Sequence, residues 1–157
     1  MIVVIGIGQR LRGDDEAGLA AVRLWQDAYP ACAGGQHIRV ELAESPGIGL
    51  LNLLENAKDA ILVDAVLSGG QPGTLHKLTE ADLAAFVAGS DSAHGWGVAE
   101  TLLLGRNLDL QALPETITII AIEAGQVNLG ETLSPAVAAV LGDAARLIQA
   151  TLKTLIS

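Results

Sequence analysis

Carboxylates and one imidazole occur at three separate points of the chain, each where a side chain can take part in chemistry. Asp14 and Asp15 follow an apolar run and a Gly-rich loop, Asp64 follows a second apolar run, and His94 lies in a loop of small residues. Two carboxylates and an imidazole suit a divalent first-row metal ion, with coordination positions left open for exchange. This combination predicts a metal site if the three points of the chain converge.

Each of these residues taken alone also has a structural explanation. Carboxylates at the start of a helix, such as Asp14 and Asp15, act as caps and interact favourably with the helix dipole, which accounts for at least one of the two. A single loop histidine such as His94 is most often an ordinary surface residue. Asp64 is harder to explain in this way, because an unpaired buried charge is costly and requires a backbone donor or a metal as its partner.

Other motifs of known chemistry are incomplete in this chain. The loop after the first apolar run has Leu11 where a dinucleotide-binding fingerprint needs its third glycine, and it lacks the Gly-Lys-Ser or Gly-Lys-Thr of a phosphate-binding loop. No Gly-x-Ser-x-Gly elbow is present, and a turn explains Ser45 more simply than a nucleophile does. Cys32 has no neighbouring base or cation to activate its thiol.

Strands that alternate with helices must position these candidate residues. Apolar and β-branched runs predict strands at 2–7, 38–42, 60–63, 74–78 and 116–122. Amphipathic and capped segments predict helices at 15–29, 47–57, 79–87 and 98–106, and a final helix of about twenty residues that starts at Ser134-Pro135. The pattern predicts an α/β fold: one three-layer α/β/α domain over 1–157, with a mainly parallel five-stranded twisted sheet and one antiparallel edge strand.

Composition excludes several classes of function. A net charge of −9 argues against nucleic-acid binding, which needs clustered cations. Apolar stretches are interrupted before they reach the length of a membrane helix, so no membrane association is expected. One cysteine in 157 residues allows no intrachain disulfide, and the chain opens on a strand pattern without an export signal, so we expect a cytoplasmic protein.

Taken in order, the motifs resemble those of the hydrogenase maturation endopeptidases, which remove a C-terminal extension from the large-subunit precursor of nickel-iron hydrogenases. The resemblance spans nearly the whole chain and depends on these segments: Gly6-Ile7-Gly8, Gly13-Asp14-Asp15-Glu16-Ala17-Gly18, Val63-Asp64-Ala65, Pro72-Gly73-Thr74, His94-Gly95 and Leu133-Ser134-Pro135. It implies a peptidase whose partner is such a precursor.

The resemblance also implies which residues form the site. The family's three metal-contacting and catalytic positions correspond to Asp15, Asp64 and His94. The metal would be nickel already carried by the precursor, so that cleavage follows successful loading, although another divalent ion can substitute. A metal held in this way polarises the peptide carbonyl or activates water, with Asp14 or Glu16 as a possible proton acceptor.

Two segments depart from the family pattern, and two other functions stay open. Gln9 replaces a common asparagine, and Ala43-Glu44-Ser45 replaces a Gly-Gly-Thr-like segment near the expected peptide cleft, which indicates a different precursor or altered binding. Arg10 and Arg12 flank the crevice and can hold a substrate carboxylate, though solubility is the simpler role. The alternatives are a metal-sensing chaperone that does not cleave the precursor and a metallohydrolase acting on small molecules.

Overall fold

A five-stranded sheet organises the computed structural model, which describes residues 1–88, 97–108 and 112–157. The strand order is β2-β1-β3-β5-β4, and only the edge strand β4 runs antiparallel to its neighbour, β5. The strands are β1 (Ile2–Gly8), β2 (Ile38–Glu44), β3 (Asp59–Val66), β4 (Leu75–Thr79) and β5 (Thr116–Glu123). This arrangement confirms the predicted mostly parallel sheet with an antiparallel edge.

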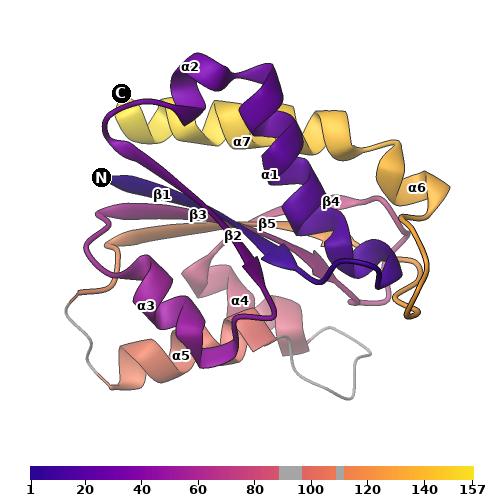
Figure 1. Ribbon diagram of the computed structural model, residues 1–157. Coiled ribbons are helices and arrows are strands. Elements are labelled where there is room, and N and C mark those ends of the chain that lie inside the picture. The colour runs from indigo at the N-terminus through magenta and orange to yellow at the C-terminus, as the bar shows by residue number, and fades with distance from the viewer. Residues whose placement is uncertain (89–96, 109–111) are drawn as a thin grey trace.

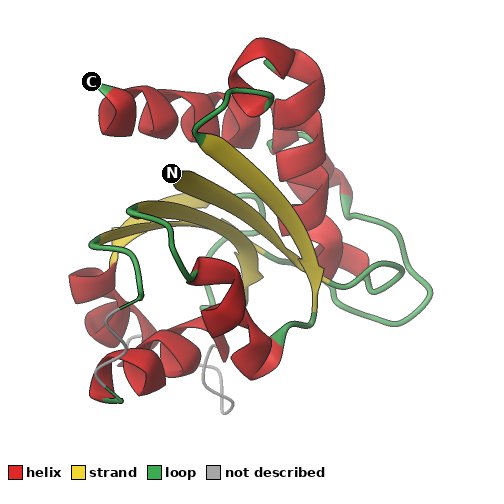
Figure 2. Ribbon diagram, turned by 60° about the vertical axis from the view of Figure 1, so that its left-hand side comes forward, coloured by secondary structure: helices red, strands yellow, loops and turns green. Residues whose placement is uncertain are grey.

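Helices cover both faces of the sheet (Figures 1 and 2). One face carries α1 (Ala17–Ala28), α2 (Pro30–Ala33), α6 (Pro135–Ala138) and α7 (Leu141–Ile156). The other carries α3 (Leu50–Leu54), α4 (Glu80–Ala88) and α5 (Gly97–Asn107). Two 3-10 turns, η1 (Gly13–Glu16) and η2 (Gly47–Gly49), precede α1 and α3. Within the described part of the chain, no helix combines the length and apolar character needed to cross a bilayer.

Two apolar cores form because successive side chains of a strand point to opposite faces. In β3, Ile61 and Val63 pack beneath α1 and α7, whereas Leu62 faces α3 and α5. Both β1 and β3 are buried along their whole length, as expected for central parallel strands covered on two sides. By the same alternation, the side chain of Asp64 lies on the α3 and α5 face of the sheet.

The carboxyl ends of the parallel strands lie together at one edge of the sheet, where their loops meet (Figure 1). The helix α1 approaches this edge very closely at Gly18. A Cβ atom at position 18 would lie 2.2 Å from the carbonyl oxygen of Ile7 and 2.3 Å from that of Val63. Only glycine permits this approach, and it brings the start of α1 against the ends of β1 and β3. In open α/β sheets such a crevice is where ligands bind.

Several predicted boundaries differ from the structure. The predicted helix 15–29 is a 3-10 turn followed by α1, and Pro30 begins the short α2, because proline is tolerated in the first turn of a helix. The predicted helix 47–57 is helical only to Leu54, since the chain extends at Glu55 and Asn56 has a φ of 63°.

Two further differences concern the later elements. The strand predicted over 60–63 continues to Val66, because its pairing with β5 extends to Glu123. The predicted final helix is two helices, α6 and α7, because the amide of Val140 bonds to the carbonyl of Val137 in a tighter turn. The loop expected to run to His94 lies mostly outside the described residues, and Ala88 belongs to α4.

Candidate active site

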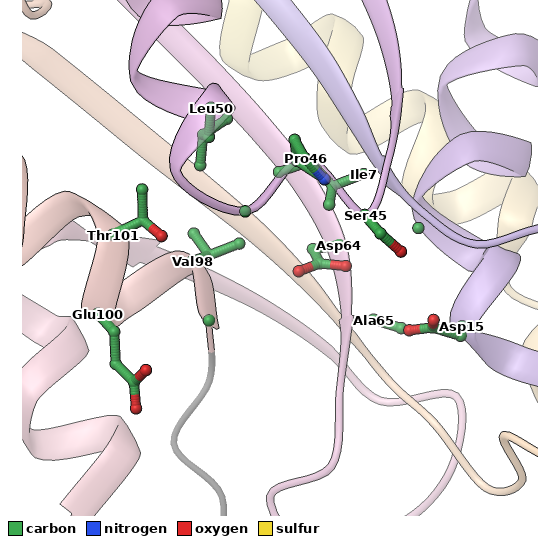
Figure 3. Close-up of a pocket in the computed structure, with 13 residues that line it drawn as sticks. Ile7, Asp15, Ser45, Pro46, Leu50, Asp64, Ala65, Val98, Glu100 and Thr101 are labelled. Carbon is green, nitrogen blue, oxygen red and sulfur yellow. The ribbon is translucent and has the colours of Figure 1, made fainter.

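A pocket of about 450 Å³ opens at the carboxyl edge of the sheet, between β1, β3 and the first turn of α5 (Figure 3). Its walls come from five separate segments of the chain. The residues lining it are Ile7, Gly8, Asp15, Ser45, Pro46, Gly47, Leu50, Asp64, Ala65, Gly97, Val98, Glu100 and Thr101. The pocket therefore lies where the sheet topology predicts a ligand crevice.

The structure brings Asp15 and Asp64 into this one pocket. Asp15 comes from η1 and Asp64 from β3, and Figure 3 shows their carboxyl groups entering the same space from two sides. Asp64 is only 7% exposed, so its side chain is largely removed from solvent. His94 lies outside the described residues, but in the sequence it precedes the pocket residue Gly97 by three positions. Two of the three predicted positions therefore share one cavity.

Glycine at position 8 allows Asp15 to reach the pocket. A Cβ atom on Gly8 would lie 2.2 Å from the carbonyl oxygen of Asp15, and that same oxygen accepts a hydrogen bond from the amide of Gln9 at 3.1 Å. Burial raises the pKa of the Asp15 carboxyl above its usual value, and the nearby Arg12 guanidinium offsets only part of this effect. An aspartate in this setting gains from a bound cation, which would compensate its lost hydration.

Asp14 has a structural role, which is a correction to its candidacy as a proton acceptor. Its side chain is fully buried and accepts hydrogen bonds from the amides of Gly125 (2.7 Å), Gln126 (3.1 Å) and Ser134 (2.7 Å) and from the Ser134 hydroxyl (2.8 Å). Burial alone would raise the pKa of Asp14, but these hydrogen bonds outweigh it and lower the pKa. A carboxylate so occupied is a weak base and does not line the pocket.

Glu16 and Arg10 also have partners on the protein. Glu16 pairs with Arg23 at 3.5 Å and does not line the pocket. Arg10 pairs with Glu44 at 3.5 Å, and its amide donates to the same carboxylate at 3.2 Å, which joins the loop after β1 to the end of β2. Glu44, which belongs to one of the departures from the family pattern, therefore contacts the loop after β1.

Ser45 lies at the rim of the pocket in a backbone conformation that non-glycine residues rarely adopt. Its φ is 44°, and its amide donates to the carbonyl of Gly8 at 3.0 Å, which continues the pairing of β1 and β2. Backbone strain of this kind concentrates at functional sites. Ser45, which belongs to the segment that departs from the family pattern, thus lines the pocket.

Sequence reasoning missed a second polar cluster at the same edge of the sheet. Glu123 is 1% exposed and accepts hydrogen bonds from the amide (2.9 Å) and hydroxyl of Ser68, and its carboxylate lies 3.2 Å from Nε2 of His76. The sequence signal for Glu123 is the same as for Asp64, because each is an acidic residue at the end of an apolar run. The strand predicted from the sequence stopped at Ile122, so Glu123 was not considered. Over 1–88, 97–108 and 112–157, no group of three acidic, histidine or cysteine side chains could hold a metal.

Comparisons with known proteins agree with this architecture. HybD, the hydrogenase maturating endopeptidase of Escherichia coli, superimposes with a TM-score of 0.80 at 23% identity, over 98% of this chain and 92% of that one. The nickel-iron hydrogenase maturation protease HybD of Thermococcus kodakarensis superimposes with a TM-score of 0.74 at 24% identity, over 96% and 98% of the two chains. These likenesses establish the fold.

Sequence comparison gives the family. The hydrogenase expression/formation protein HupD of Rhodobacter capsulatus is 29% identical over 139 residues, which are 87% of this chain and 64% of that protein, so this chain spans less than two thirds of the length of that relative. The sequence pattern of the hydrogenase maturation protease family matches residues 45–151, more than half of the chain. The protein is therefore a member of the hydrogenase maturation protease family.

Proposed function

We propose that this protein is an endopeptidase that removes the C-terminal extension of a nickel-iron hydrogenase large-subunit precursor after nickel has been inserted. The observation that carries the proposal is the meeting of Asp15 and Asp64 in one pocket, in a chain of this family. Carboxylate oxygens on a sheet edge are suitable ligands for a divalent ion, and the pocket is open to a chain that enters from outside.

The nickel ion enters this site as part of the precursor substrate. Asp15 and Asp64 supply two oxygen ligands to it, and we assign His94 as the third ligand because it precedes the pocket-lining start of α5 in the sequence. Nickel bound beside the scissile peptide supplies a Lewis acid. The donor set fits the ion, since it combines hard oxygen ligands with one imidazole and leaves positions for the precursor's own ligands.

Residues of this protein hold and orient the segment of the precursor that contains the scissile peptide bond. Asp64 comes from a central strand of the sheet, and the backbone of Asp15 is positioned by the close approach of Gly8 to its carbonyl oxygen. Asp14 and Glu16 are engaged with other residues of the protein, so we propose neither of them as the proton acceptor.

Mass spectrometry of the precursor tests the proposal. Wild-type protein is incubated with nickel-loaded and with metal-free precursor, and a shortened large subunit is expected only in the loaded sample. Asp64→Asn and His94→Ala are expected to abolish the shortening, whereas Asp143→Asn on the exposed surface of α7 is expected to leave it unchanged. Unchanged processing by both site variants would refute the site.

The same experiment separates the alternatives. A metal-sensing chaperone would bind the loaded precursor and leave its mass unchanged. A metallohydrolase for small molecules would retain a tightly held ion after purification, which elemental analysis detects, and would not shorten the precursor.

A further inference from the structure

Two leucines project from neighbouring loops beside the pocket. Leu11, in the loop between β1 and η1, is 66% exposed, and Leu129, in the loop between β5 and α6, is 80% exposed. A single exposed leucine is common on protein surfaces and needs no explanation. Leu11 and Leu129 differ from isolated surface leucines, because backbone hydrogen bonds join the loops that carry them. We refer to Leu11 and Leu129 as the leucine pair.

Backbone hydrogen bonds join the two loops. The amide of Gly130, next to Leu129, donates to the carbonyl of Leu11 at 2.6 Å. The amide of Gly13 donates to the carbonyl of Glu131 at 2.9 Å, and that of Asp14 to the carbonyl of Gln126 at 2.6 Å. The leucine pair therefore lies on one connected platform and not on two independent loops.

The platform is also anchored in the interior. The buried carboxylate of Asp14 accepts hydrogen bonds from both ends of the β5–α6 loop, at Gly125 and Ser134. Val127 and Leu133, on either side of Leu129, pack against the core. Partly buried apolar side chains thus flank the tip of this loop on both sides, while Leu129 is exposed to solvent. Such preorganisation lowers the conformational entropy lost on binding a partner.

Leu11 occupies a strained backbone conformation, with a φ of 59°. Glycine or asparagine would adopt this conformation at lower cost, and a polar residue would suit its exposure. Leucine at position 11 is therefore unfavourable for the isolated protein, both in backbone conformation and in exposed apolar surface. A contact made by its side chain would explain why leucine is present.

Polar groups surround the leucine pair. Arg12 hydrogen-bonds to Gln9 at 3.4 Å, and Asn128 hydrogen-bonds to Glu131 at 3.3 Å, all on the two joined loops. An apolar centre with a polar border is the usual composition of a protein–protein interface. The loop that carries Leu11 leads directly into Asp15, so a protein that inserts a segment at Asp15 comes close to the platform.

We propose that the leucine pair is a docking surface for the folded body of the large-subunit precursor, and that it contacts an apolar patch beside the cleavable tail. This inference rests on the proposed function, because it takes the precursor as the occupant of the pocket. The docking surface adds affinity from contacts that are separate from nickel recognition at Asp15 and Asp64.

Steady-state kinetics with nickel-loaded precursor test the proposal. Leu11→Ser and Leu129→Ser are each expected to raise KM about tenfold with little change in kcat, because they remove binding that is equal in the ground state and the transition state. Leu103→Ser is the matched control, because Leu103 is 63% exposed on α5. A KM for both loop variants equal to that of the control would overturn the proposal.

Two further measurements distinguish a loss of docking from a loss of folding and from a failure of the peptidase proposal. Leu11→Asn is expected to raise the melting temperature, because asparagine tolerates a positive φ, and yet to raise KM, which no loss of folding can explain. Calorimetric titration of precursor into an Asp64→Asn background measures docking without cleavage, so a failure of the peptidase proposal is distinguishable from a failure of docking. Self-association of the wild-type protein that Leu129→Ser abolishes would assign the surface to a second copy of this chain and overturn the proposal.

Discussion

Asp14 and Asp15 are consecutive residues with the same side chain, yet they belong to two regions with opposite properties. Asp14 lies in a buried hub, where four hydrogen bonds from the β5–α6 loop hold its carboxylate and lower its pKa. Asp15 lies at the edge of the pocket, where burial raises its pKa. The hub stabilises the ionised form of Asp14, whereas the pocket edge disfavours the ionised form of Asp15. One carboxylate therefore contributes stability, and its neighbour keeps binding capacity for a cation.

The largest expected effect is on activity, at the pocket edge. Asp15→Asn is expected to lower kcat/KM for precursor processing by at least about 100-fold, or about 2.7 kcal/mol of transition-state stabilisation, because a charged ligand is lost. The melting temperature is expected to stay the same or to rise, since a disfavoured charge is removed. Processing rates and thermal melts of the same preparation check this. A variant that melts lower and processes normally would place Asp15 in the hub with Asp14.

The next effect is on stability, in the hub. Asp14→Asn is expected to cost about 2 kcal/mol of unfolding free energy, because an amide cannot accept all the hydrogen bonds that the carboxylate accepts and adds donors facing other donors. For a chain of this size, that corresponds to a melting temperature lower by about 4–8 °C. Denaturant unfolding and calorimetry measure the change, and an unchanged midpoint would show that the hub is not a stabilising element.

The dependence on pH separates the two carboxylates by sign. The pKa of Asp14 is lowered by folding, so its stabilisation is present above the unfolded-state pKa and is lost as the pH falls through the folded-state value. The pKa of Asp15 is raised, so its ionised form destabilises the fold near neutral pH, and acid relieves this cost.

Unfolding curves measured from neutral to acidic pH check these signs. The stability difference between wild type and Asp14→Asn is expected to shrink as the pH falls. Any stability gain of Asp15→Asn over wild type is expected to shrink over the acidic range as well. A gap between wild type and Asp14→Asn that widens in acid would contradict the assignment of Asp14.

The smallest effect is expected at the exposed contact between the loop after β1 and the end of β2. Arg10→Gln removes the ion pair with Glu44, which is half exposed and therefore contributes about 0–1 kcal/mol. Processing is expected to change little, because Arg10 is paired within the protein. A large rise in KM would instead support the alternative that Arg10 holds a carboxylate of the substrate.

The sequence was sufficient for the architecture because the signals involved are local. Buried strands appear as continuous apolar runs, and the structure confirms the short strand predicted at 74–78 as the antiparallel edge strand β4. The convergence of Asp15 and Asp64 in one pocket follows from the same logic, since parallel strands deliver their carboxyl ends to one edge.

What the sequence did not reveal depends on partners that are distant along the chain. The role of Asp14 is set by Gly125 and Ser134, more than 100 residues away, so no local pattern separates it from Asp15. Glu123 was missed because its strand continues for as long as its neighbour β3 pairs with it. The break between α6 and α7 likewise has no strong local signal. The two residues between these helices are Ala139 and Val140, and neither is a proline or a glycine.

The most direct test of the account is the position of a bound divalent ion. Anomalous diffraction from crystals of the protein soaked in a nickel salt is expected to show a nickel peak in contact with the carboxylates of Asp15 and Asp64 and with the imidazole of His94. A peak that contacts only one of these side chains, or that lies at the Glu123 and His76 cluster instead, would contradict it.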